Sequence, residues 1–150
     1  MTVRLVRCDA AGEPVEPLGA LPSVLREYCA GTAALFAAIG FAPPWVGYVT
    51  VDGDQPVGGC AFVGAPKDGA VEVAYYTLDE FVGRGHATRA LARMIEIAQR
   101  ADPGLTLTAK TLPEDNPSTT ILRRNGFQFA GETSDDDIGL AWAWVLKPVR

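Results

Sequence analysis

The sequence lacks the features of membrane-spanning, secreted or disulfide-stabilised proteins. No apolar run approaches the roughly 18–20 residues that a membrane span needs, and the N-terminal segment has no signal-peptide core. Only three cysteines occur, Cys8, Cys29 and Cys60, an odd number whose wide spacing favours neither a disulfide framework nor a metal clip. We therefore expect a cytoplasmic protein without membrane or metal partners, in which these thiols are reduced and mostly buried.

The sequence also lacks an excess of basic residues. Its 13 Lys and Arg against 18 Asp and Glu give a net charge of −5, which is the wrong sign for a protein held on nucleic-acid phosphates. Nucleic acid is therefore not an expected partner, and the negative field favours encounters with cationic molecules. With 150 residues, 48% apolar composition and no low-complexity run, we expect one folded domain over residues 1–150.

Hydrophobic periodicity predicts an α/β protein built around one mixed sheet. Helical spacing extends over residues 22–39, but Gly31 and Thr32 interrupt it, so this segment is one helix or two short ones. The clearest helical face extends over 87–98, and a shorter helix over 117–125 has Asn116 as its N-cap. Strands are expected near residues 3–5 and over 46–51, 57–63, 71–78, 105–109, 127–131 and 138–146, the last two around an acidic turn at 134–137.

Residues 80–88, Glu-Phe-Val-Gly-Arg-Gly-His-Ala-Thr, lie between a predicted strand and the strongest predicted helix. Two glycines allow a tight turn whose N–H groups converge, and the helix N-terminus adds partial positive charge, so the segment suits a phosphate or diphosphate. A plain strand-to-helix turn is an equally good interpretation of this short pattern. The dinucleotide fingerprint fails because Thr88 replaces its third glycine, and no Gly-Lys-Ser/Thr phosphate loop is present.

These residues resemble the Gln/Arg-x-x-Gly-x-Gly/Ala turn of GNAT acetyltransferases, which binds the coenzyme A diphosphate. The glycines fit as Glu80-x-x-Gly83-x-Gly85 or as Val82-x-x-Gly85-x-Ala87, and the continuation Ala-Thr-Arg-Ala-Leu favours the second alignment. Asn116-Pro-Ser118, followed by a helix that ends in Gly-Phe, resembles the second motif of the family. The resemblance covers residues 45–147, and the final Trp-Ala-Trp strand is similar to the ribosomal-protein N-terminal acetyltransferase branch.

The resemblance implies the GNAT acyl-CoA N-acyltransferase fold, with about six to seven mostly antiparallel strands in a mixed sheet and about four flanking helices. It implies an N-acetyltransferase that moves an acetyl group from acetyl-CoA by direct attack of a primary amine. The amine belongs to a small molecule or to a peptide or protein N-terminus, and the protein is a monomer or homodimer. The implied coenzyme-binding residues are Tyr76, Leu78, Val82, Gly83, Arg84, Gly85, His86, Ala87, Thr88 and Asn116.

Catalysis requires a base, because an amine with a solution pKa of about 10.4 is protonated at neutral pH and cannot attack a thioester. Glu72 is the candidate, on the strand that leads into the turn, and its alternative is an ordinary solvent-facing glutamate. The resemblance places backbone N–H groups near Tyr75 and Tyr76 at the developing oxyanion. It places Ser118 near the sulfur as a proton donor, with helix capping as the alternative.

Several residues depart from the family pattern. Val82 offers no side-chain donor, and Glu80 in the other alignment brings a carboxylate that phosphate repels. Asn116 lies two residues before Ser118 rather than three, so Asp115 holds the aligned position, and Leu122 replaces a common tyrosine acid. These departures keep open a coenzyme-binding module without turnover and, more distantly, an unrelated α/β nucleotide-binding domain.

The remaining notable residues have structural and functional interpretations. We expect His86, the single histidine, to face solvent or contact phosphate rather than act as a base. Trp45, Trp142 and Trp144 fit the core better than an acceptor pocket. Arg123 and Arg124 are helix-end cations or contacts to the adenosine phosphate. The acceptor determinants are expected in the loops near residues 20–45 and 132–138.

Overall fold

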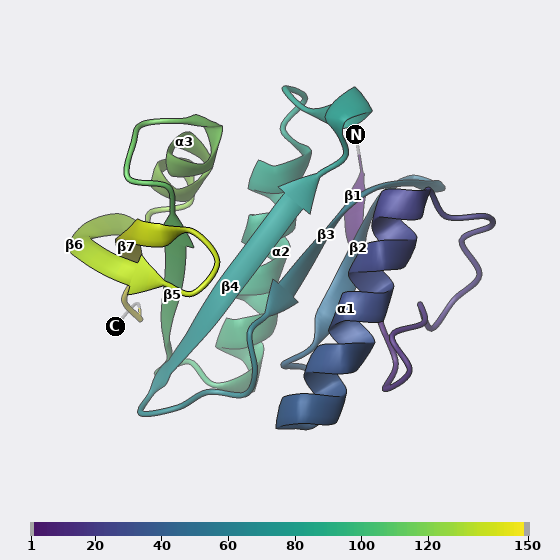
Figure 1. Ribbon diagram of the computed structural model, residues 1–150, viewed down its shortest axis with the longest axis horizontal. Helices are drawn as coiled ribbons and strands as arrows, with labels where there is room; N and C mark the ends of the chain where they lie inside the picture. Colours follow the sequence, from purple (N-terminus) through teal and green to yellow (C-terminus); the bar gives the residue numbers. More distant parts are fainter. Residues whose placement is uncertain (1, 149–150) are drawn as a thin grey trace.

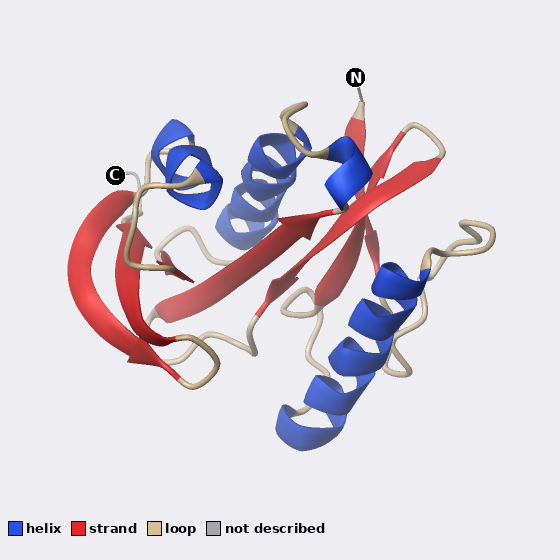
Figure 2. Ribbon diagram, turned by 45° about the horizontal axis from the view of Figure 1, so that its top comes forward, coloured by secondary structure: helices blue, strands red, loops and turns tan. Residues whose placement is uncertain are grey.

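The computed structural model describes residues 2–148 and contains one seven-stranded mixed sheet in the order β1-β2-β3-β4-β5-β7-β6. Helices α1 and α2 cover opposite faces of the sheet, and α3 lies on the α2 side (Figures 1 and 2). The elements are β1 Val3–Arg7, α1 Ser23–Ile39, β2 Gly47–Asp52, β3 Gln55–Phe62, β4 Ala70–Thr77, the short 3₁₀ helix η1 Asp79–Phe81, α2 His86–Ala101, β5 Thr106–Thr111, α3 Pro117–Arg124, β6 Gln128–Asp135 and β7 Gly139–Leu146.

The predicted fold class is confirmed, with one correction to the number of helices. Three α-helices are present in residues 2–148, fewer than the four or so expected, and residues 23–39 form one continuous helix. One glycine inside a helix costs only about 1 kcal/mol, and Thr32 after it is buried against Gly47, where an added Cβ would lie 2.8 Å from the threonine methyl group. Packing against the sheet therefore outweighs the local break signal.

The sixth strand is longer than the expected 127–131, whereas the seventh closely matches the expected 138–146. Pairing of β6 with β7 continues to Asp135 opposite Gly139, which leaves residues 136–138 as the turn instead of 134–137. The side chain of Asp135 accepts hydrogen bonds from the N–H groups of Asp137 and Ile138. These bonds stabilise a tight turn, so the strand extends into the acidic segment.

Helix α1 is held to the sheet by Tyr28. Its hydroxyl donates to the carbonyl of Cys60 at 2.5 Å and accepts from the N–H of Tyr48 at 3.2 Å. Gly59 makes room for the ring, because a Cβ there would lie 3.0 Å from it. The predicted burial of the three cysteines is confirmed, and all three are free. No helix of residues 2–148 has the length and apolarity needed to cross a membrane.

Within residues 2–148, the only parallel pair of strands joins β4 to β5, and it is short. Residues Ala70 to Glu72 lie opposite Thr106 to Thr108, after which no pairing joins the two strands. β4 remains paired to β3 as far as Thr77. The sheet therefore opens between β4 and β5 beyond Glu72, and the candidate site lies at this opening.

Candidate active site

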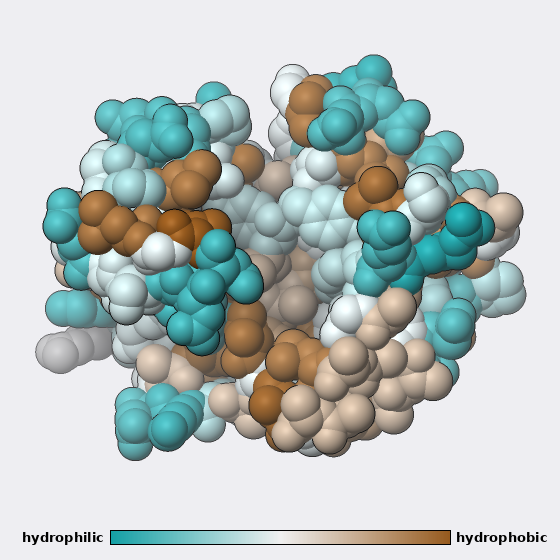
Figure 3. All heavy atoms as spheres, viewed as in Figure 1, coloured by the Kyte–Doolittle hydropathy of each residue, from teal (hydrophilic) through white to brown (hydrophobic). Residues whose placement is uncertain are grey.

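Two cavities meet where β4 and β5 separate. One has a volume of about 630 Å³ and lies between β4, the start of α2 and the start of α3. The other, of about 540 Å³, lies between β4, β5 and the turn that joins β6 to β7. Tyr75 and Ser118 line both cavities. Figure 3 shows the surface hollowed in this region, with hydrophilic side chains of the β6–β7 turn beside the hollow. We call the cavity beside α2 and α3 the first cavity, and the cavity beside β5 and the β6–β7 turn the second cavity.

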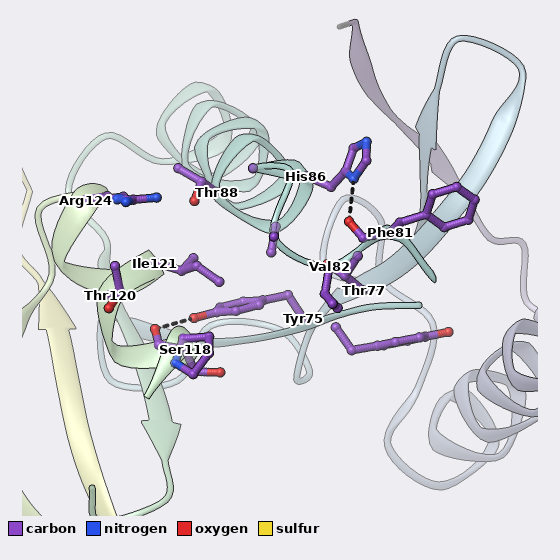
Figure 4. Close-up of a pocket in the computed structure, with 15 residues that line it drawn as sticks. Tyr75, Thr77, Phe81, Val82, His86, Thr88, Ser118, Thr120, Ile121 and Arg124 are labelled. Carbon is purple, nitrogen blue, oxygen red and sulfur yellow. Dashed lines mark hydrogen bonds between the residues drawn. The ribbon is translucent and has the colours of Figure 1, made fainter. Parts of the chain in front are cut away.

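The first cavity brings together most of the residues that the sequence nominated for coenzyme binding. Figure 4 shows β4, the turn before α2 and the start of α3 around one hollow. The predicted residues in its lining are Tyr76, Val82, Gly83, Gly85, His86, Ala87, Thr88 and Ser118. Val82, Gly85 and Ala87 of the favoured alignment all belong to this lining, whereas Glu80 does not.

The turn before α2 is shaped by two glycines in the left-handed region. Gly83 has φ 78° and Gly85 has φ 83°, and residues that carry a side chain rarely adopt these values. Gly85 is the N-cap and supplies no side-chain cap, and the first helical bond runs from the Arg89 N–H to the Gly85 carbonyl. The N–H groups of residues 86–88 therefore have no partner within the helix and point toward its open end, which suits an anion.

The start of α3 differs from that of α2, because side chains of its first turn cap its free N–H groups. The Asn116 side chain accepts from the N–H of Thr119 at 3.0 Å, and the Thr119 hydroxyl accepts from the N–H of Asn116 at 3.1 Å. The cap role therefore belongs to Asn116, which leaves the Ser118 hydroxyl outside the capping box. Tyr75 fixes this helix to β4, since its hydroxyl donates to the Ser118 carbonyl at 3.1 Å. Burial raises the pKa of Tyr75 well above its usual range, so it is a poor acid.

Three nominated residues do not line the first cavity. Leu78 is buried in the core, Arg84 lies over the ring of Phe81 at 5.7 Å, and the Asn116 side chain is used in the cap. The expectation for His86 is wrong in one respect. Its side chain is 2% exposed, and the ring is hydrogen-bonded within the protein instead of facing solvent. His86 contributes its backbone to the turn, and its ring lies among protein groups.

Five lining residues were missed from the sequence. They are Thr77, Phe81, Pro117, Thr120 and Ile121. Arg124 also lines this cavity, whereas Arg123 forms an ion pair with Asp115 at 3.0 Å and lies over Trp144. The helical spacing of Ser118, Ile121 and Arg124 was the available signal, because residues three apart share one helix face.

The second cavity contains Glu72 and is rich in carboxylates. Asp135, Asp136 and Asp137 of the β6–β7 turn also line it, together with Lys110 of β5. The side chain of Glu72 is partly buried, with 32% of its surface exposed, and Lys110 Nζ lies 3.9 Å from its Oε1 and 3.7 Å from Oδ2 of Asp135. Burial raises the pKa of Glu72, the Lys110 cation opposes this, and Asp135 adds to it.

The phase of the β3–β4 ladder decides which N–H groups face the opening. Val63 donates to the Glu72 carbonyl and Leu78 donates to the Val57 carbonyl, so even-numbered residues of β4 bond to β3. Backbone groups alternate in direction along a strand. The N–H of Tyr75 therefore points into the opening between β4 and β5, whereas that of Tyr76 points toward β3. Only Tyr75 of the two nominated residues suits an oxyanion at this place.

The loops nominated for acceptor recognition contribute unequally. Residues 134–138 line the second cavity, and no residue of 20–45 does. Trp144 is 1% exposed, and Trp45 and Trp142 pack against the main core, so the three tryptophans form no part of either cavity. Among residues 2–148, no group of three or more His, Cys, Asp or Glu side chains is arranged to hold a metal ion.

The family model of the acetyltransferase (GNAT) domain matches residues 22–128, more than two thirds of the chain. The chain belongs to the GNAT acetyltransferase family. This confirms the resemblance found in the two sequence motifs. No curated protein sequence matches the chain at a significant level.

Solved structures of GNAT acetyltransferases share the fold. RimL, a ribosomal L7/L12 alpha-N-protein acetyltransferase, matches with TM-score 0.68 and 16% identity over 97% of this chain and 90% of its own. Mycobacterium smegmatis RimJ, bound to CoA-disulfide, matches with TM-score 0.66 and 21% identity over 81% and 60%. The aminoglycoside acetyltransferase AAC(6')-Ib in complex with coenzyme A matches with TM-score 0.59 and 16% identity over 68% and 65%. The matched parts thus span less than two thirds of the last two proteins.

Proposed function

We propose that this GNAT chain is an acetyl-CoA-dependent N-acetyltransferase that acetylates a primary amine by direct attack. The observation that carries the proposal is the junction of two unlike cavities at Tyr75 and Ser118. One offers N–H donors to an anion and the other offers carboxylates to a cation. A donor with a diphosphate and an acceptor with an amine would therefore meet at the opening of the sheet.

The first cavity is the proposed site of acetyl-CoA. The free N–H groups at the start of α2 would hold the diphosphate, and Arg124, which lines the cavity on its other side, would add a cation (Figure 4). The unpaired edge of β4 would hold the acetyl-bearing arm, since its N–H and carbonyl groups beyond Glu72 have no strand partner on that side. RimJ and AAC(6')-Ib, which share the fold, have been solved with CoA groups, which supports acetyl-CoA as the donor.

The second cavity is the proposed site of the amine. Glu72 takes a proton from the acceptor ammonium, directly or through water, and its raised pKa makes it a stronger base than an exposed glutamate. The free amine then attacks the thioester carbonyl, and the Tyr75 N–H stabilises the oxyanion. When the carbon–sulfur bond breaks, the thiolate takes a proton from the cationic amine nitrogen, either directly or through the Ser118 hydroxyl, which gives up its own proton and receives that of the nitrogen. Glu72 then releases its proton to water. The products are the acetylated amine and coenzyme A with a free thiol.

A coenzyme-binding module without turnover is the second candidate. It is favoured by Leu122, which occupies the position of the common tyrosine acid and is 0% exposed in the core. Leucine has no proton that it can donate to the thiolate. In this case both cavities would persist, but the chemical step would be slow.

Two measurements test these candidates. Calorimetric titration with acetyl-CoA, NAD and ATP should show saturable binding of acetyl-CoA alone. Thiol release in the presence of a polyamine, an aminoglycoside and peptides with free N-termini should then identify an acceptor. Binding of acetyl-CoA without thiol release for any amine would support the module, and failure to bind acetyl-CoA would refute both.

A further inference from the structure

Among the residues that line the first cavity, His86 is the most deeply buried. Its side chain is 2% exposed, although the residue is the first of α2 and belongs to the lining of the cavity. Figure 4 shows the ring turned away from the side where Ser118 and Arg124 lie, toward Phe81. The ring therefore has no place in direct contact with a bound diphosphate, and its role must be exerted through the backbone.

Both ring nitrogens of His86 have protein partners. Nδ1 lies 3.2 Å from the carbonyl oxygen of Phe81, and Nε2 lies 3.0 Å from Oδ2 of Asp52. The bond from His86 holds the pKa of Asp52 below its usual range, so Asp52 is ionised at neutral pH. A carbonyl and a carboxylate can only accept, so both bonds form together when each ring nitrogen carries a hydrogen.

These two bonds close the phosphate turn on itself and attach it to the sheet. Phe81 is the last residue of η1 and His86 the first of α2, so the Nδ1 bond spans the segment that contains Gly83 and Gly85. Asp52 ends β2 on a different part of the chain. The segment between them has two glycines with positive φ and exposed residues, and glycine loses the most conformational freedom on ordering. Without an external tie, this segment would sample many shapes.

We propose that His86, held by Asp52, is the positioning residue that fixes the 81–86 turn in the shape that binds the coenzyme diphosphate. This inference rests on the proposed coenzyme site. The pair acts through geometry, because both ring nitrogens are directed at protein groups, one at the start of the turn and the other on β2. Its loss should weaken binding of a donor that contains a diphosphate and leave a donor without one unaffected.

The test compares acetyl-CoA with acetyl-pantetheine, a thioester that lacks the diphosphate. We expect the Kd of coenzyme A to rise about tenfold or more in His86→Leu. In Asp52→Asn we expect it to rise about threefold. A hydrogen bond to a charged group contributes about 1.5–3 kcal/mol, and the amide of Asn still accepts one bond. For both variants kcat/KM with acetyl-pantetheine should stay within about twofold of the starting protein. Asp54→Asn, an exposed acid of the same hairpin, is the matched control.

Hydrogen exchange at the amides of residues 82–87, measured without ligand, gives a readout that does not depend on turnover. Faster exchange confined to this segment in His86→Leu supports the inference, and unchanged exchange overturns it. Unchanged affinity for coenzyme A, or equal losses with both thioesters, also overturns it. If the starting protein binds no coenzyme A, the proposed function fails, and hydrogen exchange alone decides whether His86 fixes the turn.

Discussion

The two cavities are built from different chemical groups although they share Tyr75 and Ser118. The first depends on the main chain, with free N–H groups at the start of α2 and a turn whose glycines have positive φ. The second depends on side chains, with Glu72, Lys110 and three aspartates in its lining. Backbone donors select an anion of fixed geometry, whereas carboxylates on a turn select cations more loosely.

The difference follows from what each site has to bind in the proposed reaction. A diphosphate is the same in every acetyl-CoA molecule, so a main-chain cradle that tolerates many side chains is sufficient. An acceptor varies between family members, and a turn at the end of a hairpin can change its side chains without altering the sheet. Substitutions in the two cavities should therefore separate donor binding from acceptor chemistry.

Gly85→Asp should give the largest effect, on the donor side alone. Its carboxylate would lie at the free N–H groups of α2 and repel the diphosphate. Two like charges about 4 Å apart near a protein surface repel by about 4 kcal/mol, equivalent to an affinity loss of about a thousandfold. Calorimetry with coenzyme A measures the loss, and circular dichroism checks that the fold is retained.

Gly85→Asn is the matched control for that charge. Asn has the same size and tolerates the left-handed region better than most residues, while an added Cβ would meet only the flexible end of Arg89, at 2.5 Å. Affinity should fall much less than with Asp. Equal losses in the two variants would assign the effect to shape, and unchanged affinity in a folded Gly85→Asp variant would remove the turn from the donor site.

Glu72→Gln should give the next largest effect, on the acceptor side alone. Glutamine keeps the size of the side chain but cannot take a proton, so kcat at neutral pH should fall by about a hundredfold. Affinity for coenzyme A should stay within about twofold. Glu132→Gln, an exposed change on β6, is the control for charge. Turnover at the full rate would exclude Glu72 as the base.

Lys110→Met should alter the pH dependence of turnover. Lys110 lowers the pKa of Glu72, so its removal leaves burial and Asp135 to raise that pKa further. Because the base must be deprotonated, the acidic limb of the kcat/KM profile should move to higher pH, with rates restored at alkaline pH. Lys67→Met, an exposed lysine, should leave the profile unchanged. A shift to lower pH would contradict the assignment of Glu72.

The sequence predicted most of the fold because its turns and helices carry local signals. Asn116 as N-cap and the period of α2 depend on neighbouring residues alone, and the structure confirms both. The continuity of α1 across Gly31 depends on packing against Gly47, and the length of β6 depends on the bonds of Asp135. Such non-local contacts leave no periodic signal in the sequence.

The site was predicted unevenly for the same reason. The backbone turn was found because its glycines and the following helix are adjacent in sequence. The ring of His86 was misplaced because its partner Asp52 lies 34 residues earlier. Lys110 and Ile121 were likewise recognised as site residues only when β5 and α3 were placed beside β4. The environment of a side chain depends on residues that are distant in sequence, whereas the geometry of a main-chain turn is often determined by neighbouring residues.

The smallest expected effect concerns the acidic turn, in the double variant Asp136→Asn with Asp137→Asn. Both side chains line the second cavity and are exposed, and each exposed charge contributes only about 0–1 kcal/mol. The KM for a dicationic acceptor should rise about three- to tenfold, and the increase should disappear at high salt because exposed charges are screened. The KM for acetyl-CoA should not change, and Asp135 still accepts its two backbone bonds, so the turn persists.

The control for this prediction is the double variant Glu27→Gln with Asp54→Asn, which removes the same charge from positions outside the cavity lining. An equal rise in KM with that control would mean that net charge, and not the turn, attracts the acceptor.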